Sequence, residues 1–242
     1  MNPLQLPTDK TLNRRACISF LTLPIGCSIQ FIEPVTASKI NRTEPVGGVR
    51  KPAAGQSWTY TKYNCYNSQI LDVVEEEVVK ISKDIRIIRN SKNNSDLGDE
   101  IHSEWGRVKK DSYWDLVQTY EKFVPHWLNG MRVGEKEDFE TYYFSDTSSF
   151  RYWLSGRIYF IGWEKVKVAA GTFETMHFEK IIRLPQYDSF RLDSVRKDSI
   201  WIAPEIGRWV VKETNGEYRV SGGKSGSIRR EDNFRWQLES WI

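Results

Sequence analysis

The sequence predicts an all-β fold, in which one strongly curved antiparallel sheet forms a half-barrel or open barrel with little helix. Segments in which apolar and polar residues alternate recur from Trp58 onward, and a period of two is typical of a strand with one buried face. Turn-forming pairs such as Asn129-Gly130 and Asn215-Gly216 separate many of these segments. Short strands divided by turns indicate antiparallel neighbours.

The first element, residues 1–26, is interpreted as an export signal. Two arginines, Arg14 and Arg15, precede an apolar run that is shorter than the about 20 residues a membrane-spanning helix needs. The run ends in the letters LPIGC, which resemble a bacterial lipobox with proline where leucine is preferred. The resemblance implies cleavage before Cys27 and lipidation of that cysteine. The alternative is an ordinary buried strand that contains Cys27.

Removal of residues 1–26 would take away three basic residues and one acidic residue, so the net charge would fall from +3 to +1. A nearly neutral chain lacks the concentrated basic face that nucleic-acid binding requires. The expected partner is instead a membrane, reached through the several acyl chains of a lipid anchor. Ser28 follows the cysteine, and the absence of aspartate there resembles the pattern for sorting to the periplasmic face of the outer membrane of a bacterial envelope. No oligomeric state is predicted.

Residues 27–55 are predicted to be a flexible tether. The stretch 33–55 contains three prolines, three glycines and no aromatic residue, so it can bury little apolar surface. Aromatic residues become dense only from Trp58 onward, which predicts a single antiparallel β domain over residues 56–242.

The strands of this domain follow from the alternating segments. We expect them at Trp58–Tyr66, Ile70–Ser82, Ile85–Asn90, Glu100–Lys109, Ser112–Tyr120, Phe139–Phe144, Phe150–Val168, Phe173–Leu184, Ser189–Ile202, Trp209–Thr214 and 234–242. The segment Phe150–Val168 is far longer than a usual strand. It must therefore either bend or break, and Gly156 and Gly162 are the positions where it can kink.

No catalytic or metal-ligating group is predicted, and no cofactor. The three histidines, His102, His126 and His177, are far apart in the sequence and have no cysteine or histidine at ligand spacing. Side chains of the acidic run from Glu75 to Glu77 alternate between two faces, with Glu76 opposite the other two. We interpret the run as an edge strand or a solvated face, and the sequence contains no Gly-x-Ser-x-Gly motif.

Two later segments carry a family resemblance. Residues 163–180 contain a Val-x-Val strand before Gly171, Thr172 and Phe173, and residues 199–213 contain Trp-x-Ala-Pro-x-x-Gly, in which the last two are Pro204 and Gly207. These motifs, with an opening GQSWTY and a closing RWQLESW, resemble exported proteins of unknown function in the TapB-like group. The resemblance implies a half-barrel similar to the lipoprotein carriers LolA and LolB. It implies no activity, because the motif residues suit turns and core packing.

The function expected from these observations is that of a membrane-tethered, non-enzymatic envelope lipoprotein that binds an apolar or glycan ligand or an envelope partner. One alternative is a hydrolase that acts on envelope glycans or lipids, and another is a purely structural component. Four tryptophans of central strands are the candidate ligand contacts, and core packing is the other interpretation of each. They are Trp105, Trp153, Trp163 and Trp201.

Overall fold

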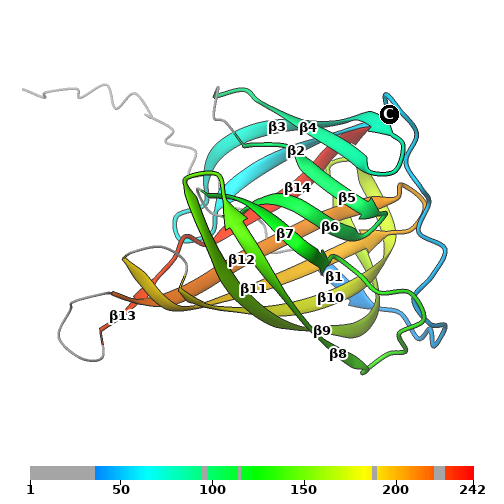
Figure 1. Ribbon diagram of the computed structural model, residues 1–242. Coiled ribbons are helices and arrows are strands. Elements are labelled where there is room, and N and C mark those ends of the chain that lie inside the picture. The colour runs from blue at the N-terminus through cyan, green and yellow to red at the C-terminus, as the bar shows by residue number, and fades with distance from the viewer. Residues whose placement is uncertain (1–35, 94–96, 114–115, 187–189, 221–226) are drawn as a thin grey trace, which may run out of the picture.

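A computed structural model describes residues 36–93, 97–113, 116–186, 190–220 and 227–242 of the chain. Within these ranges it contains strands and no helix (Figure 1). The strands are β1 (Thr36–Lys39), β2 (Ser57–Asn64), β3 (Gln69–Ile81), β4 (Ile85–Ser91), β5 (Glu100–Glu104), β6 (Arg107–Tyr113), β7 (Leu116–Pro125), β8 (Lys136–Ser145), β9 (Ser148–Val168), β10 (Gly171–Gln186), β11 (Arg191–Ala203), β12 (Arg208–Val220), β13 (Ile228–Arg230) and β14 (Phe234–Trp241). Across the described residues, no helix of sufficient length and apolarity to cross a membrane is found.

The sheet closes on itself as a barrel (Figure 1). The pairing order runs β9-β10-β11-β12-β14-β2-β3-β4-β5-β6-β7-β8, and β8 then pairs with β9 to complete a ring of 12 strands. Every neighbouring pair is antiparallel. Strands β1 and β13 lie outside the ring and pair with β9 and β12.

The prediction of an all-β, strongly curved antiparallel sheet is therefore confirmed, and its closure differs from the half-barrel or open barrel that the sequence suggested. The long strand β9 explains the closure. Its first part pairs with β8 from Ser148 to Tyr159, while residues 155–168 pair with β10 on its other edge. A strand of 21 residues can thus join the two ends of the sheet, and a closed ring has no free edges.

Two glycines of β9 have different roles. Gly162 has a φ of +145°, and the register against β10 shifts beside it, between His177 and Phe178, so the strand kinks there as predicted. Gly156 stays in regular pairing with Phe139. A Cβ atom at Gly156 would lie 2.3 Å from Cζ of Phe139, so this glycine makes room for an aromatic ring.

The residues that carry the family resemblance lie at turns and in the core. Gly171, with a φ of +137°, begins β10 directly after the turn from β9, and Phe173 is buried. Pro204 follows the end of β11, and Gly207 has a φ of +73° just before β12 begins. Gly207 also lets another segment approach, because a Cβ atom there would lie 2.3 Å from the carbonyl oxygen of Arg50.

One strand and two turns differ from the prediction. The segment Ser112–Tyr120, expected to be one strand, contains the end of β6 and the start of β7, which pair antiparallel through Tyr113 and Leu116. The segment Glu100–Lys109 is divided into β5 and β6 by a turn at Gly106, whose φ is +93°. The pair Asn215-Gly216, expected to form a turn, lies inside β12 and faces Lys197 and Arg196 of β11. The turn propensity of Asn215-Gly216 does not determine the structure there, because the pairing of β12 with strands on both of its edges outweighs it.

Part of the predicted tether lies against the barrel. Strand β1 pairs with residues Glu164–Lys167 of β9. Further along, Val46 is buried and its backbone N–H donates to the carbonyl of Met131 at 2.7 Å. The N–H of Arg50 donates to the carbonyl of Pro204 at 2.9 Å. Residues 36–50 thus form a strap on one end of the barrel (Figure 1). The strap is held there because scattered apolar side chains such as Val46 pack against the barrel. Residues 1–35, with the predicted signal and Cys27, lie outside the described residues.

Side chains fill most of the interior of the barrel. Large aromatic residues such as Trp58, Tyr60, Phe160 and Phe178 are completely buried. They belong to the main core cluster, and a second cluster around Tyr143 and Leu154 is formed by residues of β6, β7, β8, β9 and β10.

Candidate functional site

The inside of the barrel holds an inner ion-pair network of five charged residues, Glu76, Arg89, Glu100, Asp111 and Arg208. Their side chains are almost completely inaccessible to solvent. Arg89 lies 3.0 Å from Glu76 and 2.6 Å from Asp111 and also contacts Glu100. Arg208 lies 2.7 Å from Glu76 and 2.6 Å from Glu100. Each carboxylate therefore has an arginine partner, as buried charges require.

This geometry sets the ionisation of the carboxylates. Burial alone would raise the pKa of Glu100, but Arg208 and Arg89 outweigh burial and hold that pKa well below its usual range. The pKa of Asp111 is also lowered, because Arg89 outweighs the effect of burial. A glycosidase needs one carboxyl group with a raised pKa to protonate the leaving group. These carboxylates have the opposite property and cannot supply that acid.

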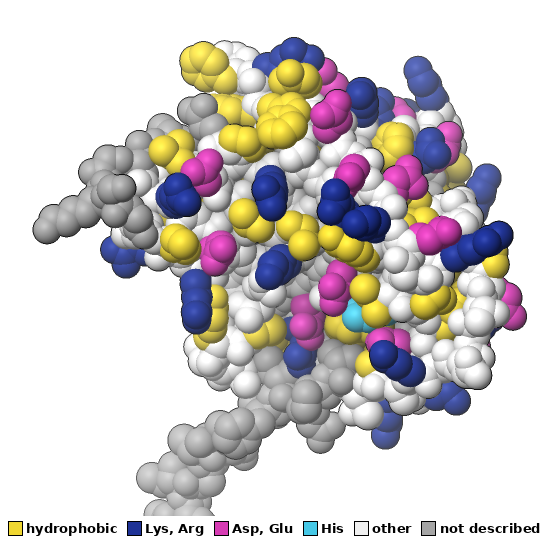
Figure 2. Space-filling view, turned by 90° about the horizontal axis from the view of Figure 1, so that it is seen from below, with side chains coloured by type: hydrophobic (Ala, Val, Ile, Leu, Met, Phe, Trp, Pro, Cys, Tyr) yellow, Lys and Arg dark blue, Asp and Glu magenta, His cyan; other side chains and the backbone are white. Residues whose placement is uncertain are grey.

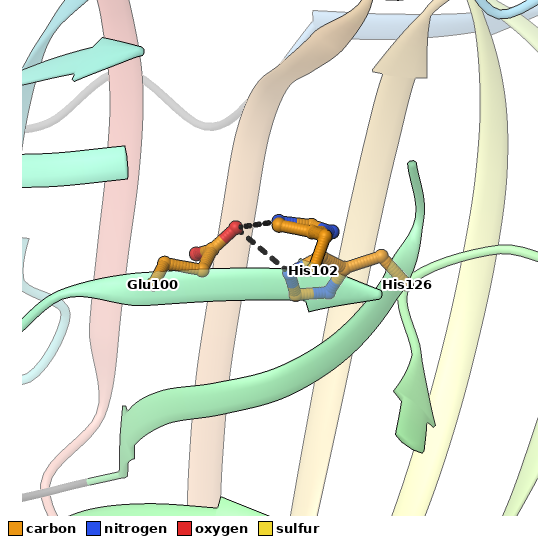
Figure 3. A group of neighbouring side chains, drawn as sticks. All are labelled: Glu100, His102 and His126. Atoms are coloured by element: carbon orange, nitrogen blue, oxygen red, sulfur yellow. Dashed lines mark hydrogen bonds and ion pairs between the residues drawn. The ribbon is translucent and has the colours of Figure 1, made fainter. Parts of the chain in front are cut away.

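Two histidines that are distant in the sequence meet beside this network (Figure 3). The ligand atoms of Glu100, His102 and His126 all lie within 4.8 Å of one another, and all three residues are buried. Such a group of donors resembles a metal site, which spacing along the chain did not indicate. The hydrogen bonds of these residues show whether they can hold a metal ion.

The protons on His102 are assigned by its two neighbours. The backbone N–H of Gly106 donates to Nδ1 of His102 at 3.3 Å, so Nδ1 must be an acceptor. Nε2 therefore carries the proton and donates to Glu100 at 2.5 Å. A metal-ligating histidine needs one unprotonated nitrogen free for the metal while the other donates its proton, but the unprotonated Nδ1 of His102 is already occupied by the N–H of Gly106. Glu100 is also occupied by two arginines, so the group fits a structural network and does not fit a metal site.

His126 is neutral for a different reason. Its side chain is buried, and burial lowers the pKa of the imidazole to about 3. Neither ring nitrogen has a hydrogen-bond partner within the described part of the chain. The contact with Glu100, at 3.7 Å, is too long for a hydrogen bond.

A second carboxylate–histidine pair lies on β9 and β10. Nδ1 of His177 lies 3.3 Å from Glu164, and the indole N–H of Trp201 donates to the other oxygen of Glu164 at 2.7 Å. Trp201 also stacks on His177 with a centroid distance of 4.3 Å. The carboxylate orients the imidazole as in a nucleophile–base system, but no nucleophile contacts His177 among the described residues. Burial raises the pKa of the Cys65 thiol, so that cysteine is poorly suited to the role.

The four predicted ligand contacts are not brought together. Trp105 is buried and donates to the carbonyl of Gly207 at 2.8 Å. Trp163 is buried beneath the guanidinium of Arg42, and Trp201 is buried as described above. Trp153 is the exception, since 41% of its surface is exposed.

Trp153 lines a groove on the outside of the barrel wall. Its neighbour Leu154 points into the core, so Trp153 faces outward. Two adjacent hollows share Ser155 and Arg183 and together form what we call the outer groove. One hollow, of about 580 Å³, is lined by Asp138, Phe139, Glu140, Ser155, Gly156, Arg157, Tyr159, Ile181 and Arg183. The other, of about 500 Å³, is lined by Trp153, Ser155, Arg183, Leu184, Pro185, Asp193, Ser194, Val195, Glu217, Tyr218, Arg219 and Ile228.

Charged and aromatic side chains are mixed along the outer groove. Arg157 holds Asp138 with two hydrogen bonds of 2.5 and 2.9 Å and lowers the pKa of that carboxyl. Arg219 lies 3.5 Å from Asp193 across the β11–β12 pair. The view from below shows the same mixture more widely, with basic and acidic side chains interspersed and hydrophobic ones gathered at the upper edge (Figure 2). The sequence indicated Trp153 but not the groove, because the groove depends on the pairing register that places the outward side chains of strands β8 to β13 next to one another.

Comparison with known proteins gives only a remote likeness. The sequence matches no protein-family model and no curated protein sequence. A solved structure from Parabacteroides distasonis, described provisionally as a lipoprotein, has a TM-score of 0.48 and 12% identity and covers 78% of this chain and 96% of its own. A Bacteroides fragilis protein, described provisionally as exported and with a YmcC-like fold, has a TM-score of 0.48, 13% identity and the same coverage. The hypothetical lipoprotein YmcC of Escherichia coli has a TM-score of 0.41 and 10% identity and covers 76% of this chain and 83% of its own. At these TM-scores and identities the likeness transfers no role to this chain.

Proposed function

We propose that this chain is an envelope lipoprotein that binds a glycan in the outer groove without chemical conversion, with Trp153 as the main contact. The observation that carries the proposal is the exposed indole of Trp153 beside a groove of ligand size. Sites for small ligands usually measure about 300–1,000 Å³, and each hollow falls within that range. An exposed flat aromatic ring offers a surface on which the C–H face of a sugar ring can pack.

The polar lining favours a sugar over a lipid chain. Arg183, Arg219 and Glu217 line the hollow that contains Trp153, and such planar groups can form paired hydrogen bonds with neighbouring hydroxyls. An acyl chain would desolvate these charged groups without offering them any hydrogen bond, which is costly. The centre of the barrel is filled by side chains such as Trp58 and Phe160, which also favours a ligand on the outside.

The envelope location rests on the sequence. A basic start, an apolar run and a lipobox-like LPIGC precede Cys27, and this order is typical of exported lipoproteins. Mass spectrometry of the protein from a bacterial membrane fraction tests this part. We expect a chain that begins at Cys27 and is heavier by several acyl groups, whereas an unprocessed chain of unmodified mass would contradict the anchor.

Binding is tested with soluble oligosaccharides of N-acetylglucosamine and N-acetylmuramic acid by isothermal titration calorimetry. Trp153→Ala should weaken binding about ten-fold or more, which corresponds to about 1.4 kcal/mol. The matched control is Trp241→Ala, because Trp241 has a similar exposed fraction of 37% and does not line the outer groove. Both variants should unfold like the wild type. Equal binding by both variants, or binding of fatty acids in place of saccharides, would contradict the proposal.

A hydrolase is the second candidate, and one observation favours it. Asp193 and Glu217 are two carboxylates on adjacent strands of the same hollow, and Asp193 has an unusual positive φ of +47°. Strained backbone of this kind is common at functional sites. The same oligosaccharides should remain intact during prolonged incubation if the protein only binds them. Cleavage that Asp193→Asn or Glu217→Gln abolishes would establish the hydrolase instead.

A further inference from the structure

A separate cavity lies inside the barrel, next to the inner ion-pair network. It has a volume of about 60 Å³ and is bounded by side chains of β2, β3, β4, β6, β11, β12 and β14, with Trp209, Phe234 and Trp236 as its aromatic wall. Four cationic side chains line it, namely Lys62, Arg89, Arg196 and Lys212, against two carboxylates, Glu76 and Asp111. The lining therefore carries an excess of positive charge.

Lys212 accounts for much of that excess. Arg89 is neutralised by three carboxylates of the inner ion-pair network, and Arg196 lies 2.7 Å from Asp198. Lys212 is 93% buried, since only 7% of its surface is exposed. Its ammonium lies 5.7 Å from the ring centroid of Trp209, and among the described residues no carboxylate forms a close ion pair with it. Its charge acts on Asp111 and Asp198 only from a longer distance, where it helps to lower the pKa of each. A buried ammonium without a carboxylate is costly unless an anion accompanies it.

The excess of positive charge also affects the neighbouring side chain of Lys180. Burial lowers the pKa of Lys180 to about 8, and the positive charges of Lys212 and Arg196 lower it further against the opposing effect of Asp198. The positive field thus extends beyond the lining of the cavity.

Two buried polar atoms on the lining residues also lack partners. Oδ1 of Asp111 accepts from Arg89 and from the N–H of Ser112, while Oδ2 has no hydrogen-bond partner in the described ranges. The indole N–H of Trp209 is unpartnered there as well. Buried polar atoms normally have partners. A ligand that satisfies all three groups must accept protons from Lys212 and Trp209 and donate one to Asp111.

We propose that this cavity binds hydrogen phosphate. Its oxygens accept from Lys212 and Trp209, and its hydroxyl donates to Oδ2 of Asp111. Sulfate has a similar shape and charge but carries no hydroxyl at neutral pH, so Asp111 would repel it. This site is independent of the outer groove, and its occupation does not depend on glycan binding.

The test is calorimetric titration of the full chain in a chloride buffer, first with inorganic phosphate and then with sulfate. We expect one phosphate per chain and a sulfate affinity at least about ten-fold lower, which corresponds to about 1.4 kcal/mol, since sulfate cannot donate the hydrogen bond to Asp111. This comparison uses the wild-type protein alone. Equal affinity for the two anions, or binding of neither, would overturn the proposal.

Single substitutions test whether the phosphate binds in the cavity beside Lys212. Lys212→Met should abolish phosphate binding, whereas Lys197→Met, which removes the same charge from an exposed position on β11, should leave it unchanged. Trp153→Ala should also leave it unchanged, which separates this site from the outer groove. Circular dichroism and thermal melts show whether each variant is folded. Phosphate binding that persists in folded Lys212→Met would contradict the assignment.

Discussion

At the scale of single residues, Glu76 shows what the sequence can and cannot reveal. Alternation along Glu75, Glu76 and Glu77 correctly placed Glu76 opposite its two neighbours. The interpretation of the run as an edge or a solvated face is wrong for Glu76, because β3 has partners on both sides and this carboxylate is completely buried. Its partner Arg208 is 132 positions away. Nothing in the local pattern identifies a contact at that distance.

Removing the charge of Glu76 should destabilise the barrel. In Glu76→Gln, Arg89 and Arg208 each lose a charged partner inside the protein, and breaking a buried ion pair costs about 3–5 kcal/mol. We expect urea unfolding to show a loss of about 3 kcal/mol. Glu75→Gln is the control, because Glu75 is exposed on the same strand and should change the free energy of unfolding by less than about 0.5 kcal/mol. Similar losses in both variants would contradict the network.

His126 should make the stability depend on pH. Burial lowers its pKa to about 3 from a model-peptide value of 6.5, so below pH 6.5 the unfolded chain binds a proton that the folded chain does not. Stability is then lost as the pH falls from about 6.5 towards 3, by up to about 1.4 kcal/mol per pH unit. In His126→Gln this loss should be smaller over the same range, as measured by urea unfolding at several pH values. Parallel pH profiles would contradict a neutral, buried imidazole.

At the scale of elements, most strands were predictable because alternation is a local property. The predicted ranges overlap the observed strands from β2 to β12 and at β14. The turn at Gly106 was missed because the glycine stands alone between Trp105 and Arg107, without a turn-forming pair such as Asn-Gly to mark it. The reason for a glycine there is not local, since the ring of Trp127 lies over it.

Gly106→Ala should therefore cost more than backbone strain alone. Gly106 and Gly130 both have positive φ angles, +93° and +86°, and left-handed backbone costs a residue with a side chain about 1–2 kcal/mol. A Cβ atom at Gly106 would lie 2.5 Å from the ring of Trp127, whereas nothing lies within 4 Å at Gly130. Thermal or urea unfolding should show an additional loss of about 1–3 kcal/mol in Gly106→Ala relative to Gly130→Ala. Equal losses would show that Trp127 can move away.

At the scale of the whole molecule, closure and the extent of the folded body could not be predicted from the sequence. Closure requires the two end strands of the sheet to pair with each other. Here these strands are β8 and β9, which are consecutive in the sequence. They would also pair in an open meander, so their pairing alone does not predict a closed barrel. The end of the tether depends on a few apolar residues, such as Val46, that pack on the barrel in a stretch whose composition is typical of a linker.

If Cys27 carries the anchor, only residues 28–35 separate it from β1. Eight residues span at most about 29 Å, so the barrel would remain close to the membrane surface.

The boundary of the folded body can be measured by truncation. A chain that begins at residue 36 keeps β1, the buried side chain of Val46 and the hydrogen bonds to Met131 and Pro204. It should melt at the temperature of the full chain. A chain that begins at residue 51 loses all of these interactions and exposes the wall beneath them, so its free energy of unfolding should fall by a few kcal/mol, about 0.5–1.5 for each lost hydrogen bond and about 1.5–3 for a buried aliphatic side chain. Equal melting temperatures for the two truncated chains would show that the tether extends to residue 50 and that the barrel is anchored on a much longer segment.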